Sequence, residues 1–366
     1  MSTLRKIFFN IHLYLGLAGS LIFFVVAITG GILTYEFEID HRLNSKLYYV
    51  DPQPQRVPLA QLGPAAEKAV PGKRAVVLYL ARNEGLAHEV IMNDGLRVTV
   101  NPYTGEVQGS RMIQGRLMAK VQDIHRRLML KNSLLVSYST VAMLVLACSG
   151  LYLWWKTKIV GFKSRGSARR FNFDLHHVSG FYFLIPVLLI ALSGVVLGFD
   201  KYLLPPQLDA KGRPVRPPQP TSTPQPGVPA ISVDEAFAKA MAALPGARIT
   251  TVGLALGPRA TYQFTMKLPE DNTPGGRSQV AIDKYSGQVL QMQTSRDLRG
   301  LRSIIYWSRQ IHTGEFWGWP TRLLFLIATL AIAVQAVSGV IMWIARIRTQ
   351  RKKAAPVTSQ HDPVTI

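Results

Sequence analysis

The sequence predicts an α-helical integral membrane protein, in which a bundle of four transmembrane helices carries two α+β modules on one side of the membrane. Three observations support this prediction. Hydrophobic residues make up 48% of the 366-residue chain, and they gather in four long blocks. Two long and more polar connections separate the first block from the second and the third from the fourth. Motifs of the first half recur in the second half, which predicts an internal two-fold duplication.

Each of the four blocks is long enough to cross a hydrocarbon core of about 30 Å as an α-helix. We expect the first block to be retained, because its apolar run is longer than that of a signal peptide and no convincing small-residue cleavage motif accompanies it. The single cysteine, Cys148, lies in the second block, so neither a disulfide framework nor a thiolate metal site is expected within one chain. The blocks cover residues 13–35, 134–155, 178–199 and 323–345.

The net charge of +21 is distributed unevenly along the chain. Thirteen basic residues and only two acids, Asp174 and Asp362, lie in the N-terminus, the connection between the second and third blocks, and the tail. The positive-inside rule therefore places both termini and this middle connection in the cytoplasm, and the two long connections in the periplasm of a bacterium. This predicts a multi-pass inner-membrane protein whose inner basic residues face anionic lipid, with no nucleic acid as a partner.

The two long connections follow the same pattern of elements. Residues 59–70 predict a helix that a Pro-Gly pair ends, and strands follow at 75–81, 88–92 and 96–100. After an extended linker with nine prolines between residues 205 and 229, a second helix at 233–244 is again ended by Pro-Gly and followed by strands. The turn Tyr103-Thr-Gly-Glu-Val is matched by Tyr285-Ser-Gly-Gln-Val.

The predicted organisation follows from these blocks and connections. It comprises an N-terminus and first helix (1–35), a first periplasmic module (36–120), a ligand-bearing segment and second helix (121–156), a cytoplasmic basic loop (157–173), a third helix (174–200), a proline-rich linker (201–230), a second periplasmic module (231–300), a ligand-bearing segment and fourth helix (301–346), and a cytoplasmic tail (347–366).

The strongest repeat starts at two histidines in the first and third blocks. Each is followed by a glycine after four residues and by a hydroxyl–glycine pair after seventeen and eighteen residues. On an α-helix, steps of four and eighteen residues return close to one face, so each helix offers an imidazole and bare backbone on the same side. Such a face suits a flat, bulky ligand. The residues concerned are His12, Gly16, Thr29 and Gly30 in the first helix, and His176, Gly180, Ser193 and Gly194 in the third.

The second and fourth blocks are preceded by His125 and His312, and each block ends in a Ser-Gly motif. If the second helix is unbroken, Gly150 falls close to the face of His125. The fourth helix does not follow this spacing, and we expect Trp317-Gly-Trp-Pro320 to interrupt it.

The remaining histidines are assigned other environments. Since only His176 has a glycine four residues on, His177 is expected to lie beside the site and not in it. We expect solvated or locally bonded side chains for His41, His88 and His361.

Four histidines paired at two depths predict haem ligands. Two zinc ions would each need about four ligands, and no acid or cysteine accompanies these pairs. Haem accepts two neutral imidazoles from facing helices, and without a Cys-x-x-Cys-His motif the two haems are expected to be non-covalent b haems. His12 and His176 are the expected ligands of the haem near the cytoplasmic face, and His125 and His312 those of the haem near the periplasmic face. Arg126, Arg127, Arg302 and Arg309 are candidates to pair with haem propionates or an acidic chelate, or simply lie at the lipid surface; both interpretations stay open.

The His-x3-Gly and Thr-Gly patterns, the Ser-Gly-Leu-Tyr-Leu-Trp-Trp ending and the Tyr-Thr-Gly-Glu-Val turns resemble the PepSY-associated transmembrane family. The resemblance covers nearly the whole chain except the proline-rich linker and the tail. Four-span members resemble inner-membrane dihaem ferric-siderophore reductases of the FoxB type. The resemblance therefore implies two bis-His b haems, two periplasmic PepSY modules, and reduction of iron on the outer side.

The leading hypothesis is an oxidoreductase that passes electrons from a cytoplasmic or quinol donor to a periplasmic ferric siderophore, reducing Fe(III) to Fe(II). Two alternatives remain: a haem-based oxidoreductase with another periplasmic acceptor, such as a redox protein, and a non-enzymatic membrane anchor or sensor. Direct oxidation of NAD(P)H is not expected, because no Gly-x-Gly-x-x-Gly motif follows a strand.

Overall fold

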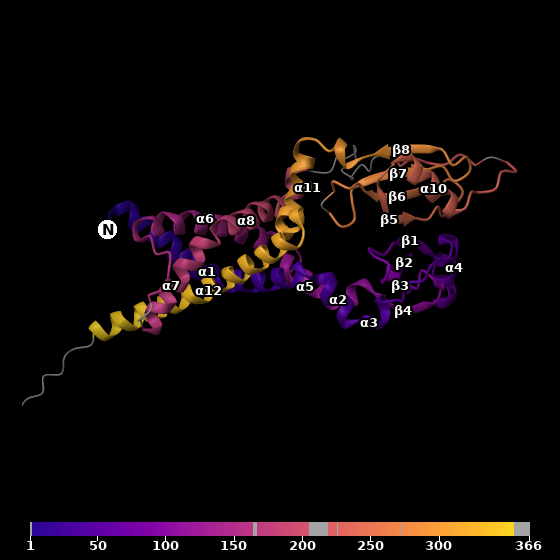
Figure 1. Cartoon of the computed structure of the whole chain (residues 1–366). Coiled ribbons are helices and arrows are strands. Elements are labelled where there is room, and N and C mark those ends of the chain that lie inside the picture. The colour runs from indigo at the N-terminus through magenta and orange to yellow at the C-terminus, as the bar shows by residue number, and fades with distance from the viewer. Residues whose placement is uncertain (1, 164–166, 205–218, 225, 272, 355–366) are drawn as a thin grey trace, which may run out of the picture. The chain divides into compact units, whose positions relative to one another are not determined.

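The computed structural model describes residues 2–163, 167–204, 219–224, 226–271 and 273–354 (Figure 1). The chain forms two compact units. The helical unit comprises the chain up to Gly31, residues Ile124–Gly198, and the chain from Leu324 onward. The sheet unit comprises Ile32–Asp123 and Phe199–Leu323.

Three helices of the described chain are long and apolar enough to cross a membrane: α1 (Thr3–Thr34), α6 (Leu134–Thr157) and α12 (Trp319–Ala354). A fourth span exists if α7 (Ala168–Tyr182) and α8 (Leu184–Gly198), which are bent by 65°, count as one. Apolar side chains such as Leu21 and Ile185 are 73% and 71% exposed, as expected of helices that face lipid. The inner faces pack around Phe23, Ala27, Leu146, Val187, Ala328, Ile332 and Ala333.

The third predicted helix, 174–200, differs from the structure in its start and its continuity. Helix α7 already begins at Ala168, and the chain bends at Phe183 before α8. Pro186 explains the bend, because its nitrogen has no hydrogen to donate to the carbonyl four residues earlier, and its ring crowds that turn. Gly180 and Gly194 therefore lie on separate helical segments, and the expected common face with His176 does not extend past the bend.

The second predicted helix is also interrupted. Helix α5 (Leu117–Arg127) ends at a loop in which Leu128 and Met129 have φ values of 51° and 60°, which L-residues rarely adopt. Helix α6 starts only at Leu134, so the phase from His125 to Gly150 cannot be carried along one helix.

The chain before the fourth span contains the interruption that its Trp-Gly-Trp-Pro motif predicts. Helix α11 (Gly300–Thr313) is followed by the short 3-10 helix η3 (Glu315–Trp317) and then by α12. Gly314 and Gly318 have φ values of 72° and 73°, a conformation that glycine adopts without strain.

The sheet unit contains one antiparallel sheet of eight strands in the order β4-β3-β2-β1-β5-β6-β7-β8 (Figure 1). The two predicted modules share this sheet because β1 pairs with β5, with Leu78 opposite Val252. Helices α4 (Leu59–Ala69) and α10 (Val233–Ala243) pack on it, and both halves contribute to one hydrophobic core. The strands are β1 (Ala75–Tyr79), β2 (His88–Met92), β3 (Leu96–Val100), β4 (Val107–Met112), β5 (Arg248–Gly253), β6 (Tyr262–Lys267), β7 (Ser278–Ile282) and β8 (Val289–Gln293).

Short elements connect the sheet to the rest of the chain. The helices are α2 (Glu36–Leu43), α3 (Ser45–Tyr48) and α9 (Asp200–Leu203), and the 3-10 turns are η1 (Ile113–Gly115) and η2 (Ser295–Asp297). Residues 205–218 and 225 of the predicted proline-rich linker lie outside the described residues, as do His361 and the end of the predicted tail (355–366). The described end of the linker is packed: Ser222 is buried, its N–H donates to the carbonyl of Arg259 at 3.0 Å, and its hydroxyl accepts from the N–H of Lys284 at 2.8 Å.

His88 lies in strand β2 and is only 3% exposed. Its Nδ1 accepts a hydrogen bond from the N–H of Ala81 at 3.0 Å. Burial, reinforced by the charge of Arg56, lowers the pKa of His88 from 6.5 to about 4. The folded protein therefore holds a neutral imidazole that the unfolded chain protonates below pH 6.5.

The unfolding free energy should accordingly fall as the pH drops from about 6.5 to 4, by about 3 kcal/mol at most. We expect thermal unfolding of the sheet unit, followed in the full-length protein, to move to lower temperature in this range. The neutral variant His88→Gln should show a flatter pH dependence. An unchanged slope in that variant would assign the acid sensitivity to other groups.

Candidate functional site

A cavity of about 960 Å³ lies among the helices of the helical unit. Its volume is at the upper end of the range of about 300–1,000 Å³ that is usual for ligand pockets. His12 of α1 and His176 and His177 of α7 line it, together with predominantly apolar residues. Three of the predicted glycines, Gly16, Gly150 and Gly180, line it. The apolar lining includes Phe9, Leu13, Leu17, Met143, Leu146, Phe181, Leu184 and Ile332.

The rings of His12 and His176 face one another in this cavity. Their centroids are 6.3 Å apart, and the ring planes are nearly perpendicular at 88°. A metal–imidazole bond is about 2 Å long, so two rings that hold one metal ion from opposite sides have centroids ~6 Å apart once about 1 Å from each ring nitrogen to its centroid is added. The observed separation therefore suits a single metal ion between the two imidazoles.

A serine fixes the tautomer of His12. The hydroxyl of Ser149 lies 2.7 Å from the carbonyl oxygen of Val145, which can only accept, so the hydroxyl donates its single hydrogen there. His12 Nδ1 lies 3.0 Å from the same hydroxyl and must then be the donor. The lone pair of His12 is thus on Nε2, the nitrogen that a metal ion would bind.

Ser338 holds His176 in the same way. Its hydroxyl donates to the carbonyl of Gln335 at 3.2 Å and accepts from His176 Nδ1 at 2.9 Å. The glycine after each serine adjoins the ring: a Cβ on Gly150 would lie 3.1 Å from Cε1 of His12, a tight contact, whereas one on Gly339 would lie 3.6 Å from Cε1 of His176, an ordinary van der Waals contact. Each Ser-Gly pair is therefore a seat for one imidazole from another helix.

A third seat holds His125. Its Nδ1 lies 2.9 Å from the carbonyl oxygen of Val26 and 3.3 Å from the hydroxyl of Thr29, both on α1. A Cβ on Gly30 would lie 2.9 Å from Cε1 of His125. Gly30 thus makes room for the His125 imidazole, whereas the sequence pattern grouped it with the face of His12. Gly150 likewise adjoins His12 and not His125, with whose face the sequence grouped it.

The other histidines have different surroundings. His312 lies on α11 in the sheet unit, while His125 belongs to the helical unit, so their pairing stays a prediction. Gly194 lies on α8 beside the buried Ser193. His177 donates from Nδ1 to the carbonyl of Phe173 at 2.8 Å and also lines the cavity. His41 is half-buried, with its ring 4.2 Å from that of Tyr48.

Four arginines line the cavity, although the sequence assigned the basic ends of the helices to lipid. Arg170 is paired with Asp174 at 2.7 Å, and Arg169 donates to the hydroxyl of Thr349 at 3.2 Å. The other two are Arg5 and Arg346, whose guanidinium lies 5.0 Å from the ring centre of Phe9. The four arginines that the sequence singled out lie elsewhere: Arg126 and Arg127 are exposed at the end of α5, and Arg302 and Arg309 are exposed on α11.

The donor set of the cavity fits haem. Within the described residues, no group of three or more His, Cys, Asp or Glu side chains could hold a metal ion. The cavity instead offers two neutral imidazoles, so a metal ion there needs a ligand that supplies the other donors, as a porphyrin does. Bare backbone at Gly16 and Gly180 admits a flat ring, and guanidinium groups can pair with its carboxylates.

Ser149 and Ser338, which contact the two histidines, were not predicted from the sequence. Both halves of the chain carry Ser-Gly near the end of a span, and only the glycine was given a role. The recurrence of the hydroxyl at both places, and of Thr29 and Ser193 before the other two glycines, was the available signal.

Helices of membrane-spanning length joined to an antiparallel sheet unit define the chain as a membrane protein. More specifically, it belongs to the family of the PepSY-associated TM region, whose model matches residues 9–346. The family that the sequence motifs indicated is thereby confirmed. A search of curated proteins found no match to the chain.

Proposed function

We propose that this protein is a haem-dependent ferric-siderophore reductase of the bacterial inner membrane, which transfers electrons from an inner donor to a periplasmic ferric chelate. The observation that carries the proposal is the pair of facing imidazoles, His12 and His176, 6.3 Å apart in a cavity of haem size. A haem b bound there supplies a reversible one-electron change between Fe(III) and Fe(II).

The residues of the cavity have distinct parts in this proposal. His12 and His176 would hold the iron of a bound haem, and Ser149 and Ser338, which contact Nδ1 of each ring, leave the lone pair on Nε2 to bind it. A haem held by both imidazoles would have no position on its iron left for substrate. The acceptor is then a compound that takes an electron without binding the iron. Ferric siderophores meet this requirement, because hydroxamate and catecholate chelators hold Fe(II) poorly and release it after reduction.

The proposal includes the finer topology that the sequence predicts. In it, helices α7 and α8 are taken as one bent span, which gives four spans, and the positive-inside rule then favours cytoplasmic termini and a periplasmic sheet unit. A second b haem is proposed on His125 and His312. It is supported by the duplicated motifs and by the seat of His125 on α1, where Thr29 and Gly30 adjoin the ring as Ser149 and Gly150 adjoin that of His12.

Reoxidation of the reduced protein tests the function. Purified protein, reduced with dithionite and freed from excess reductant, is mixed anaerobically with a ferric siderophore while the Soret band and capture of Fe(II) by a ferrous chelator are followed. We expect the haem to reoxidise with one Fe(II) captured per electron. Matched samples of His12→Ala should deliver fewer electrons per protein.

The other outcomes separate the alternatives. Haem that stays reduced with every ferric chelate, but reoxidises with a quinone or a redox protein, would replace the siderophore with that acceptor. A purified protein without a Soret band would identify a non-enzymatic anchor or sensor.

A further inference from the structure

The helices that carry His12 and His176 share a second repeated feature. In each helix an arginine lies seven residues before the histidine, and a phenylalanine lies three residues before it. Seven residues are nearly two turns of an α-helix, so each arginine lies on the face of its histidine, about 10 Å away along the axis. All of these residues line the cavity of the helical unit. They are Arg5, Phe9 and His12 in α1, and Arg169, Phe173 and His176 in α7.

Arg5 and Arg169 lie at the same end of the cavity, beside the C-terminal part of α12. The guanidinium of Arg346 on α12 lies 5.0 Å from the ring centre of Phe9, which is one turn from Arg5. Thr349, the next turn of α12, accepts a hydrogen bond from Arg169 at 3.2 Å. Guanidinium groups from three helices thus flank this end, and the described residues that line the cavity include no acid.

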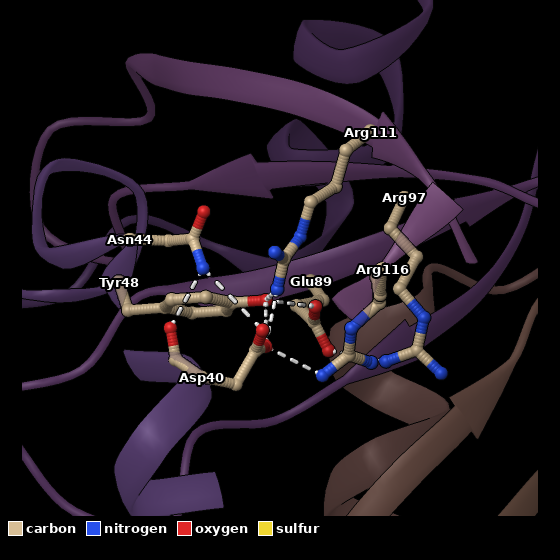
Figure 2. Close-up of polar contacts among 7 residues, drawn as sticks. All are labelled: Asp40, Asn44, Tyr48, Glu89, Arg97, Arg111 and Arg116. Atoms are coloured by element: carbon tan, nitrogen blue, oxygen red, sulfur yellow. Dashed lines mark hydrogen bonds and ion pairs between the residues drawn. The ribbon is translucent and has the colours of Figure 1, made fainter. Parts of the chain in front are cut away.

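The sheet unit shows how the protein accommodates half-buried arginines elsewhere (Figure 2). Arg111 and Arg116 both pair with Asp40 of α2, whose side chain is only 2% exposed. Arg97 of β3 pairs with Glu89 of β2 at 2.6 Å. Each of these guanidinium groups therefore has a carboxylate as counter-charge.

Arg5 and Arg169 have no such carboxylate within the part of the chain that the structure describes. The Nε of Arg5 is buried and has no hydrogen-bond partner there. Arg169 is more exposed and donates to a neutral hydroxyl, that of Thr349. A half-buried guanidinium without a counter-charge costs free energy, so an anionic ligand at this end of the cavity would be stabilised. A carboxylate suits it best, because it can accept two parallel hydrogen bonds from one guanidinium.

We propose that Arg5 and Arg169 bind the two propionates of the haem whose iron His12 and His176 hold. The inference deepens the proposed function, on which it rests. A haem b carries both propionates on one edge of the porphyrin, and two arginines at one end of the cavity match that arrangement. The pairing directs this edge toward the arginines and the apolar edge toward the interior of the helices.

The two arginines also act on the iron through their charge. A positive charge near the iron disfavours Fe(III) relative to Fe(II), so Arg5 and Arg169 raise the midpoint potential of this haem. The sequence considered Arg126, Arg127, Arg302 and Arg309 for the propionates, but none of them lines this cavity.

The test compares Arg5→Gln and Arg169→Gln with Lys6→Gln in the purified full-length protein. Lys6 is adjacent to Arg5 and carries the same charge, but it is exposed and does not line the cavity. Three properties are measured: the propionate bending vibration in the resonance Raman spectrum, the midpoint potential, and the rate at which haem is lost to apomyoglobin. His12→Ala identifies which signals belong to this haem.

We expect each arginine variant to shift the propionate vibration of this haem and to lower its midpoint potential. Haem loss should become about tenfold faster, because one hydrogen-bonded charge pair is removed. The axial ligands are untouched, so the low-spin electron paramagnetic resonance signal should persist. Lys6→Gln should leave the vibration and the rate of haem loss unchanged.

The outcomes separate the inference from the function it rests on. A wild-type protein without haem would overturn the proposed function itself. Bound haem with an unchanged propionate vibration in either arginine variant, whatever its potential, would overturn the assignment of that arginine and leave it to anionic lipid. If a glutamine variant does not retain haem or does not fold, Arg5→Lys and Arg169→Lys decide the question, because lysine keeps the charge but not the two parallel hydrogen bonds. A shifted vibration with little change in potential then supports the inference, and an unchanged vibration contradicts it.

Discussion

Replacing His12 or His176 by alanine is expected to remove one of two haems, and the same one in both variants. The centroids of the two rings are 6.3 Å apart in one cavity, so either substitution takes away one of the two proposed protein ligands of that haem. Pyridine haemochrome analysis should fall from about two equivalents of haem b per chain to about one. The substitutions His125→Ala and His312→Ala should remove the other haem.

His177→Ala is the matched control for this prediction. His177 is adjacent in sequence, also lines the cavity, and is bonded to the carbonyl of Phe173 instead of a Ser-Gly pair. We expect this variant to keep both haems. Added imidazole should restore the absorption of the His12→Ala protein, because it can occupy the vacated space. Loss of haem in His177→Ala with retention in His176→Ala would reverse the assignment of the ligand.

Replacing Gly30 by leucine is expected to prevent haem binding at His125, although the substitution replaces no ligand residue. A Cβ at Gly30 would lie 2.9 Å from Cε1 and 3.3 Å from Nδ1 of His125, closer than side chains tolerate, and the rest of the leucine adds to the clash. The His125 ring must leave its seat on α1. The spectrum of the His125 haem should be lost, while the haem at His12 and His176 stays spectrally normal.

Gly16→Ala on the same helix provides the comparison. Its new Cβ would lie 3.7 Å from Leu146, an ordinary van der Waals contact, and would face the cavity of His12 and His176, so the haem at His125 should persist in this variant. A Gly30→Leu protein with two unperturbed haems would show that the seat on α1 does not govern ligation by His125. It would thereby weaken the assignment of His125 as a ligand.

Local sequence patterns located the elements of this protein well. The strands at residues 88–92 and 96–100 and the start of the helices at 59 and 233 agree with β2, β3, α4 and α10, because alternation, length and Pro-Gly pairs act over a few residues. The bend at Phe183 was missed, although Pro186 lies only three residues on. A proline near the start of an apolar run is compatible with a helix that simply begins there, so the sequence alone does not separate a bend from a start.

The proposed ligands His12 and His176 were found from local sequence patterns, but the serines that contact them were not. A repeated His-x3-Gly pattern was enough to select His12 and His176 as partners and to prefer His176 over its neighbour. The serines that hold them lie 137 and 162 residues away in the chain, and nothing local to either residue indicates the contact.

By itself, the sequence determined that this is a membrane protein with helical spans, two similar α+β regions and paired histidines. These properties follow from hydrophobic length, short-range periodicity and internal repetition. Only the tertiary structure decided that β1 joins both regions into one sheet, that Ser-Gly pairs orient His12 and His176, and that Asp40 ties Arg111 and Arg116 to α2. Each of these contacts joins segments distant in sequence, and it forms because a buried hydrogen-bonding or charged group must find a partner wherever the fold places one.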